Sequence, residues 1–286
     1  MTITAQSVKE LREKTGAGMM DCKKALQEND GDMDKAVDWL RQKGLSKAAK
    51  KAGRATSEGL VGMKIDADEQ RAVLVEVKCE TDFVSRGEKF QDFVKTIVDH
   101  VDAHFTPDTA ELLAQPTEGG TVQDLLTSTI ATIGENMQIG RTAEVRMSAP
   151  GIVGHYLHSN GKIAVLVEIK ADSVNDVVRE AAKNVAMQIA AANPMALDPE
   201  SLDPAAQERE REVYRQKARE EGKPEAIVEK IAEGAVKKFF KEVCLLEQAY
   251  IRDDKMTVRD VLKAASKEAG TPISVGRFVR LQLGVE

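Results

Sequence analysis

One segment of this 286-residue chain occurs twice, and the repetition constrains the possible folds more than any other feature. The first copy begins at Gly59-Leu-Val-Gly and ends with Ala72-Val-Leu-Val-Glu-Val-Lys78. The second begins at Gly151-Ile-Val-Gly and ends with Ala164-Val-Leu-Val-Glu-Ile-Lys170. Matched positions are 92 residues apart throughout, as from 59 to 151, so the copies align without a gap. Features that both copies share are expected to be structural, and features of one copy alone are candidates for function.

Each copy predicts a β-hairpin followed by a helix. In the first copy, Val61, Met63 and Ile65 alternate with small or polar residues, and a polar turn leads into the Val- and Leu-rich residues 72–77. Apolar residues then recur at helical spacing at Phe90, Phe93, Val94, Ile97, Val98 and Val101. The second copy has a hairpin over 151–170 and then a helical face of Val177, Val178, Ala181, Val185 and Ile189. The pair predicts an α+β fold whose core is two duplicated sheet-plus-helix subdomains.

Residues 2–43 predict three short helices. Breaks occur at Thr15-Gly-Ala-Gly18 and Asn29-Asp-Gly31, Asp32 is a good N-cap for the third helix, and Gly44 is expected to end it. The Lys- and Arg-rich residues 43–54 follow. We interpret them as a solvated connector, a helix that joins rather than packs, in preference to a phosphate-binding segment.

The composition changes after Asn193-Pro194. Residues 204–243 are dense in charged side chains and predict two long helices hinged at Gly222-Lys-Pro224, with too few apolar residues for a core of their own. Such a hairpin projects from the body or packs on a partner, so it is a candidate for homodimer contacts. A helix after Thr257 and a strand within 273–285 complete the chain.

The predicted division has four parts: a helical bundle with its connector, an N-subdomain of the core, a C-subdomain with a C-terminal module, and an inserted helical hairpin. Their bounds are 1–54, 55–140, 141–193 together with 244–286, and 194–243. A chain of this length suffices for about two domains of ordinary size, each with its own core.

Charge and cysteine usage limit the function classes. The net charge of −6 and the isoelectric point near 5.5 argue against a protein whose main task is to wrap nucleic acid. The three cysteines, Cys22, Cys79 and Cys244, are widely spaced and indicate a reducing compartment without a disulfide framework. The sequence shows no signal-like apolar core and no run long enough to cross a bilayer. We therefore expect a cytoplasmic protein that binds neither nucleic acid nor membrane.

Motifs for covalent chemistry are absent from the sequence. It contains no Walker loop, no Gly-x-Gly-x-x-Gly after a strand and no Gly-x-Ser-x-Gly. Cys22 is interpreted as a small buried thiol. His155 and His158 are three apart in a predicted strand, which places them on opposite faces and argues against a shared metal. We expect no cofactor, no metal and no enzymatic activity.

The two copies differ after their last strand. Lys78 is followed by Cys-Glu-Thr81-Asp82-Phe83-Val84, whereas after Lys170 Ser173 and Asp176 resemble a capping box that starts the helix directly. In the first copy a capping box comes later, at Ser85 and Glu88.

Two interpretations of the extra residues in the first copy remain open. Phe83 fills the core of its own subdomain while Asp82 caps the helix, or Phe83 is an aromatic anchor with an adjacent carboxylate, presented to a partner protein. Residue types alone slightly favour the first interpretation.

Four motifs carry a family resemblance. They are the run from Val8-Lys-Glu-Leu-Arg to Cys22-Lys-Lys-Ala-Leu26, Thr81-Asp-Phe-Val84, Ile133-Gly-Glu-Asn136 and Gly222-Lys-Pro224. Together they resemble the elongation factor Ts family over nearly the whole chain. The resemblance implies a three-helix N-terminal bundle like a ubiquitin-associated (UBA) domain, a core of two related subdomains, a protruding helical hairpin and a C-terminal module. It also implies guanine-nucleotide exchange on the translation GTPase elongation factor Tu.

The resemblance also implies site residues. Arg12, Met19 and Met20 would dock on the nucleotide domain of the GTPase, although Met19 and Met20 could equally be core residues. Thr81, Asp82, Phe83 and Val84 would enter that domain beside the magnesium site and displace the ion. Ile133, Gly134 and His158 would make further contacts. The factor would bind GDP-bound and nucleotide-free elongation factor Tu without binding nucleotide directly.

Two other function classes fit parts of the sequence. A UBA-type adaptor would use the N-terminal bundle for helical or ubiquitin-like partners, but it would not need an extra element in only one repeat. A ribosome-associated RNA-binding factor is disfavoured by the acidity outside residues 43–54 and by the lack of aromatic stacking motifs.

Overall fold

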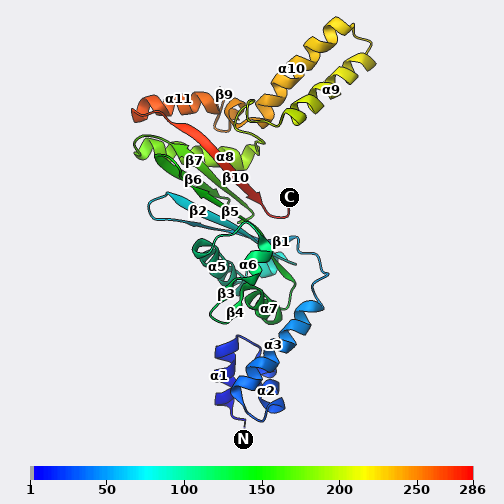
Figure 1. Ribbon diagram of the computed structural model, residues 1–286, viewed down its shortest axis with the longest axis vertical. Helices are drawn as coiled ribbons and strands as arrows, with labels where there is room; N and C mark the ends of the chain where they lie inside the picture. The colour runs from blue at the N-terminus through cyan, green and yellow to red at the C-terminus, as the bar shows by residue number, and fades with distance from the viewer. Residues whose placement is uncertain (1–2, 286) are drawn as a thin grey trace. The chain divides into compact units, whose positions relative to one another are not determined.

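The computed structural model describes residues 3–285, which divide into two compact units (Figure 1). The first unit contains the chain up to residue 64, residues 73–144 and the residues from 281 onward, and the second contains residues 65–72 and 145–280. Helices and small sheets occur in both, so the predicted α+β class is confirmed, as is the N-terminal helical region. The four-part division stays a prediction.

The N-terminal helices are α1 (Ala5–Thr15), α2 (Met19–Glu28) and α3 (Met33–Ala49). They enclose a small apolar cluster of Val8, Leu11, Cys22, Ala25, Leu26 and Ala36. Asp32 caps α3, because its carboxylate accepts hydrogen bonds from the backbone N–H groups of Asp34 and Lys35. The three predicted helices are therefore confirmed.

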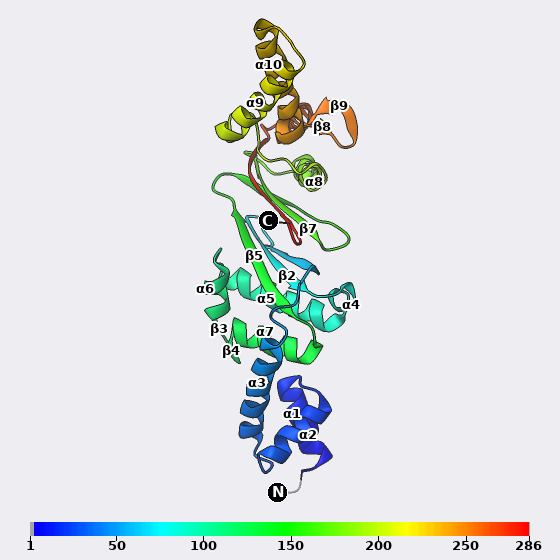
Figure 2. The ribbon, with the colours of Figure 1, turned by 90° about the vertical axis from the view of Figure 1, so that its right-hand side faces the viewer.

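The predicted end of α3 is wrong. Gly44 lies inside the helix, which continues to Ala49 and packs against α7 (Val122–Ile133) (Figure 2). Gly44 is a buried residue within α3, and a Cβ atom there would lie 3.5 Å from the Cβ of Ala131, an ordinary contact distance, so this glycine faces α7 and is not a C-cap. Ala48 packs against the core of the first unit, so the start of the predicted connector does not merely join two parts.

The sheet of the first unit has the strand order β1-β2-β5. Its strands are β1 (Glu58–Ile65), β2 (Arg71–Cys79) and β5 (Met137–Arg146). Alternate residues of β2 pack against α5 (Glu88–Ala103), α6 (Thr109–Ala114) and α7. A short ribbon of β3 (Pro116–Thr117) and β4 (Gly120–Thr121) precedes α7. The hairpin and α5 confirm the prediction for the first copy, whereas β5 and α7 were not predicted.

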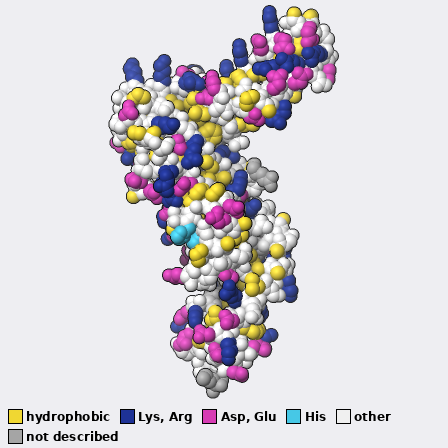
Figure 3. Space-filling view, viewed as in Figure 1, with side chains coloured by type: hydrophobic (Ala, Val, Ile, Leu, Met, Phe, Trp, Pro, Cys, Tyr) yellow, Lys and Arg dark blue, Asp and Glu magenta, His cyan; other side chains and the backbone are white. Residues whose placement is uncertain are grey.

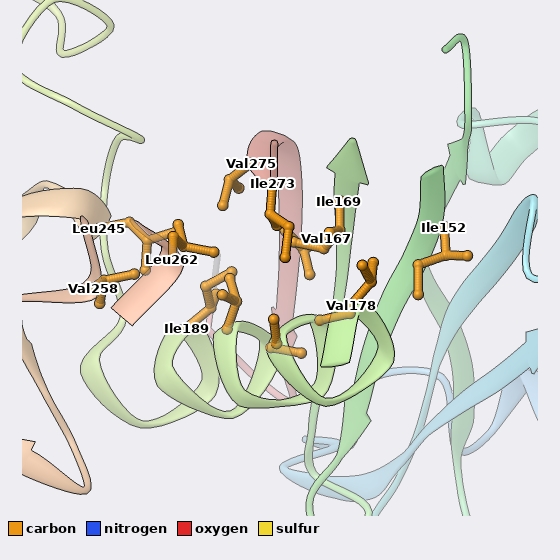
Figure 4. Close-up of a cluster of buried hydrophobic side chains, with 14 of the residues drawn as sticks. Ile152, Val167, Ile169, Val178, Ile189, Leu245, Val258, Leu262, Ile273 and Val275 are labelled. Atoms are coloured by element: carbon orange, nitrogen blue, oxygen red, sulfur yellow. The ribbon is translucent and has the colours of Figure 1, made fainter. Parts of the chain in front are cut away.

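The second unit repeats this plan, with the strand order β10-β7-β6. Its strands are β6 (Gly151–Leu157), β7 (Ile163–Lys170) and β10 (Ser274–Gln282). Strands β6 and β7 pair antiparallel from Gly151 opposite Lys170 to Leu157 opposite Ala164. Helix α8 (Asp176–Ala192) covers this sheet, and α11 (Val258–Ala269) contacts α8. Figure 4 shows their buried side chains meeting in one apolar cluster.

The repetition extends to the third strand of each sheet. Gly140 of β5 and Gly276 of β10 each adjoin a buried glutamate. A Cβ atom at either glycine would overlap the carboxylate, that of Glu76 or Glu168 respectively. The next residue in each strand is an arginine that pairs with that carboxylate. These matched positions are 136 residues apart, as from 140 to 276, and they mark the third strands as part of the duplication.

The predicted helical hairpin is confirmed as α9 (Pro204–Glu220) and α10 (Glu225–Val243). The two helices pack together, and Figure 3 shows cationic and anionic side chains mixed on their surface. Arg215 contacts three carboxylates, of Glu208, Glu212 and Glu229.

The chain returns from the hairpin to the sheet of the second unit. A 3₁₀ turn η1 (Leu245–Glu247) and a ribbon of β8 (Ala249–Tyr250) and β9 (Asp253–Thr257) lead on to α11. Within residues 3–285, no helix has the length and apolar character that a membrane span requires.

Candidate functional site

Phe83 lies on a single helical turn, α4 (Asp82–Ser85), between β2 and α5. Its side chain is 86% exposed, whereas the neighbouring Val84 turns inward and packs against the core of the first unit. The interpretation that Phe83 fills the core of its own subdomain is therefore wrong. Asp82 does not cap the helix either; its carboxylate pairs with Arg86 at 3.0 Å.

The residues predicted to cap the following helices are wrong in both copies. Thr81 caps α4 by accepting the N–H of Val84 at 3.4 Å, and α5 begins after Gly87 without a side-chain cap. In the second copy the cap is Asn175, whose Oδ1 accepts the N–H of Val178 at 3.1 Å, while Ser173 is exposed. An N-cap residue has an extended backbone and directly precedes the first helical residue. The position at which the helix begins therefore determines which polar residue caps it.

The element that carries Phe83 is attached to the C-terminal end of α7. The carboxylate of Glu135 accepts the N–H of Thr81 at 3.0 Å and its hydroxyl at 2.6 Å. In the opposite direction, Glu80 Oε1 accepts the backbone N–H of Asn136 at 2.5 Å. Thr81 and Glu135, 54 positions apart in the chain, therefore bring the Thr-Asp-Phe-Val and Ile-Gly-Glu-Asn motifs together, and the neighbouring Glu80 adds a second contact.

Asn136 extends this attachment to the residues after α3. Its side-chain amide is buried and donates to the backbone carbonyl of Arg54 at 2.8 Å. Arg54 in turn lies 3.4 Å from the carboxylate of Glu80. Glu80, Glu135 and Asn136 are not among the site residues predicted from the sequence, although the Ile-Gly-Glu-Asn motif contains two of them.

Ile133 and Gly134 occupy the end of α7 beside this attachment. Ile133 is half-buried and packs against the core, while Gly134 is exposed and ends the helix with φ 96°. The amine of Lys51 lies 4.0 Å from where a Cβ on Gly134 would stand. Burial lowers the pKa of Lys51, and the nearby cations Arg54 and Lys47 lower it further.

Met19 and Met20 begin α2 and are 58% and 74% exposed. The interpretation that they belong to the core is therefore wrong, because the buried face of α2 is formed by Cys22, Ala25 and Leu26. Arg12 is also exposed, near the end of α1. These three side chains lie on the N-terminal bundle and are available for contact with a partner.

His158 belongs to the second unit. It directly follows β6, is exposed, and has its Nδ1 3.0 Å from the hydroxyl of Tyr156. Among the residues that the structure describes, no three or more His, Cys, Asp or Glu side chains gather as a metal site would require.

The three thiols are buried. Burial raises the pKa of Cys22, and it raises the pKa of Cys244 to about 11. Because the thiolate is the nucleophilic form, neither of these two residues is suited to nucleophilic chemistry. Cys22 is thus the small buried thiol predicted from the sequence.

Comparison with known proteins identifies one family over the whole chain. The family described as "Elongation factor TS" matches residues 80–285, and "Elongation factor Ts, mitochondrial, N-terminal" matches residues 1–53. The chain is 61% identical over 288 residues to elongation factor Ts of Nitratidesulfovibrio vulgaris (strain DP4), covering 99% of this chain and 96% of the relative. It is 58% identical to that of Lawsonia intracellularis (strain PHE/MN1-00), over the full length of both chains. Elongation factor Ts of Clostridium novyi (strain NT) is 50% identical, over 99% of this chain and 93% of the relative.

Proposed function

The chain belongs to the elongation factor Ts family, and from this membership we propose that it promotes exchange of GDP for GTP on the GTPase elongation factor Tu. Its general role as a translation elongation factor follows from the family itself. The proposed activity needs no bond chemistry and no bound cofactor in this chain. It requires a surface that binds the nucleotide-free GTPase more tightly than the nucleotide-bound form.

The observation that carries the proposal is the exposure of Phe83 on an element that Thr81 and Glu80 attach to the residues after α7. A large apolar side chain that is 86% exposed gains free energy when a partner buries it. Full burial would contribute about 1.5–3 kcal/mol. At 1.4 kcal/mol per decade, this corresponds to roughly a 10- to 150-fold change in affinity.

Linkage connects this contact to nucleotide release. A GTPase holds its nucleotide partly through Mg²⁺, which bridges the phosphates to the protein. If Phe83 enters a cleft beside that ion which is open only in the nucleotide-free state, the factor and the nucleotide weaken each other's binding by the same factor. Asp82, next to Phe83, would add a negative charge that repels phosphate or competes for the ion.

The remaining candidate residues would supply docking area. Arg12, Met19 and Met20 would contact the nucleotide domain of the GTPase, as would Ile133 and Gly134 beside the Phe83 element. His158 would make a separate contact from the second unit. Binding through these groups raises affinity for both nucleotide states, whereas only contacts specific to the nucleotide-free state accelerate release.

The test is release of a fluorescent GDP analogue from elongation factor Tu, followed by stopped-flow mixing. Phe83→Ala should fold normally, because the side chain is exposed, and should lower the maximal release rate roughly tenfold or more. Met195→Ala, which removes another exposed apolar side chain, is the matched control and should have no effect. Undiminished acceleration by Phe83→Ala would refute the proposed role.

A docking role for the N-terminal bundle predicts a different kinetic signature. Met20→Ser should raise the concentration of factor needed for half-maximal release, by roughly tenfold if this methionine is an interface hot spot. The maximal rate should stay the same, because the Phe83 element is intact. A lower maximal rate at unchanged half-saturation would assign Met20 to the exchange step itself.

Co-purification distinguishes this function from the adaptor and RNA-binding alternatives. The exchange factor should form a salt-resistant complex with the GTPase that GDP and Mg²⁺ dissolve and that nuclease leaves intact. A complex with ubiquitin-like proteins, or one that nuclease destroys, would favour the corresponding alternative.

A further inference from the structure

Helix α4 is too short to hold Phe83 in one direction without support. It has four residues, and a single helical turn is unstable in water because forming it fixes several backbone angles for very few hydrogen bonds. Its defined position therefore depends on contacts from outside the turn. The strongest candidates are the charge-assisted hydrogen bonds between Thr81 and Glu135.

The Thr81 hydroxyl links Glu135 to the start of α4. A hydroxyl has one proton and two lone pairs, so it can donate to Glu135 and accept from the N–H of Val84 at the same time. By taking the proton, the carboxylate orients a lone pair toward the first turn of α4. Glu135 therefore supports the N-cap of the helix that bears Phe83.

The second copy of the repeat provides an internal control. Through the match of Gly140 with Gly276, Glu135 and Asn136 correspond to Thr271 and Pro272. Threonine has no carboxylate, and proline has no N–H to donate to the residue that corresponds to Glu80. The second copy also has no helix between β7 and α8. Within this chain, the paired carboxylate contacts and the Phe83-bearing helix occur in the same copy.

We propose that Glu135 is a positioning residue for nucleotide exchange, which acts through Thr81 to hold α4 and Phe83 in the orientation that enters the GTPase. This inference rests on the proposed function. It gives the Glu of the Ile-Gly-Glu-Asn motif a role within this chain, in contrast to the partner contacts proposed for Ile133 and Gly134.

The first test measures amide hydrogen exchange in the free protein. The N–H groups of Ser85 and Arg86 donate to the carbonyls of Thr81 and Asp82, so they report on the integrity of α4. In Glu135→Gln, one of the two Thr81 donors loses its acceptor, and the protection of these amides should fall roughly tenfold while α5 and α7 keep theirs. Glu118→Gln, the same change at an exposed site in the first unit, is the control. Unchanged protection in Glu135→Gln would overturn the proposal.

The second test measures the exchange reaction. Glu135→Gln should lower the maximal rate of GDP release several-fold without changing the half-saturating concentration of factor, because the docking surfaces are untouched. Thr81→Val removes the linking hydroxyl, and the double variant should lose no more than the more severe single variant. Additive losses would show that Glu135 acts independently of Thr81 and would overturn the proposal.

The two tests separate the inference from the proposed function. Reduced protection together with an unchanged maximal rate would overturn the positioning role while leaving the exchange function standing. If the unmodified chain does not accelerate release, the exchange function fails, and hydrogen exchange alone then decides whether Glu135 holds α4.

Discussion

The two copies of the repeat share their architecture and differ at one junction. Both have a hairpin, a covering helix, a third strand and a buried glutamate paired with an arginine. In the first copy the strand-to-helix junction contains α4 with its exposed Phe83, while in the second Asn175 starts α8 directly. The shared features form the core of each unit, whereas the added helix contributes Val84 to the core of the first unit and exposes Phe83 to solvent.

The largest expected effect concerns the glycines that open each hairpin. Gly59 and Gly151 have φ of 142° and 144°, and a Cβ at either would overlap the carbonyl oxygen of the paired strand, at Val77 or Ile169. Alanine should cost about 3 kcal/mol or more at each position, measured by denaturant unfolding. Gly119→Ala, where nothing lies within 4 Å, should be nearly neutral. If alanine were tolerated at only one of these two positions, the two hairpins would not be structurally equivalent.

The buried ion pairs should differ in strength between the copies. Glu76 is 2% exposed and accepts from Arg141 Nε at 3.2 Å and from the N–H of Gly284 at 2.9 Å. Glu168 accepts from Arg277 Nε at 2.8 Å, and the side chain of Arg277 is 57% exposed. Arg141→Met should cost about 3 kcal/mol of folding stability, because it leaves a buried charge unpaired. Arg277→Met should cost about 1 kcal/mol, because Arg277 is more exposed and solvent screens its interaction with Glu168. Chemical denaturation measures both, and equal losses would contradict the asymmetry.

The pair in the first copy also predicts a pH dependence. Burial alone would raise the pKa of Glu76, but the hydrogen bonds from Arg141 and Gly284 outweigh it, so the pKa lies below its ordinary value of 4.5. A lowered carboxyl pKa stabilises the fold above the ordinary value, and this stability is lost as pH falls through the folded-state pKa.

Without Arg141, burial would dominate and Glu76 would protonate more readily. The stability difference between the unmodified protein and Arg141→Met should therefore be greatest near neutral pH and shrink below the ordinary value of 4.5. Urea unfolding between about pH 7 and pH 3 measures it. A difference that is independent of pH would show that the arginine acts through packing alone.

The smallest expected effect concerns the helix start in the second copy. Asn175 caps α8, and its amide also donates to the carbonyl of Ala269 at 3.1 Å. Asn175→Ala should cost about 1 kcal/mol in thermal unfolding. The exposed Ser173 is the matched control, and Ser173→Ala should change stability by less than about 0.5 kcal/mol. If Ser173→Ala lowered stability more than Asn175→Ala, Ser173 would be the N-cap, as the sequence predicted.

Periodicity predicted the local elements well where neighbours in the chain determine them. The hairpins, α5, α8 and the α9–α10 hairpin were all visible as alternating or helical patterns. Strands β5 and β10 carry a weaker signal, Gln138-Ile-Gly-Arg141 against Ser274-Val-Gly-Arg277. This signal does not recur at the 92-residue spacing of the hairpins, because segments of different length separate the third strand from each hairpin.

The prediction for Gly44 and the interpretation of Phe83 as a core residue failed for a common reason. A glycine after a helical pattern resembles a C-cap, but α3 packs against the distant helix α7, and this tertiary packing stabilises α3 beyond Gly44. An aromatic residue resembles a core residue, but Phe83 sits on a turn that Thr81 and Glu135 hold with the side chain outward. Both outcomes depend on residues far along the chain.

Residue order was sufficient to establish the duplication, the α+β class and the family, since these follow from patterns that neighbouring residues carry. The direction of Phe83 and the role of the Ile-Gly-Glu-Asn motif emerged when folding placed β2 beside β5. That pairing brings Glu80 and Thr81 to Asn136 and Glu135, across more than fifty positions of chain. Hydrogen bonds act over about 3 Å of space regardless of separation in sequence, so contacts of this kind leave no periodic signal.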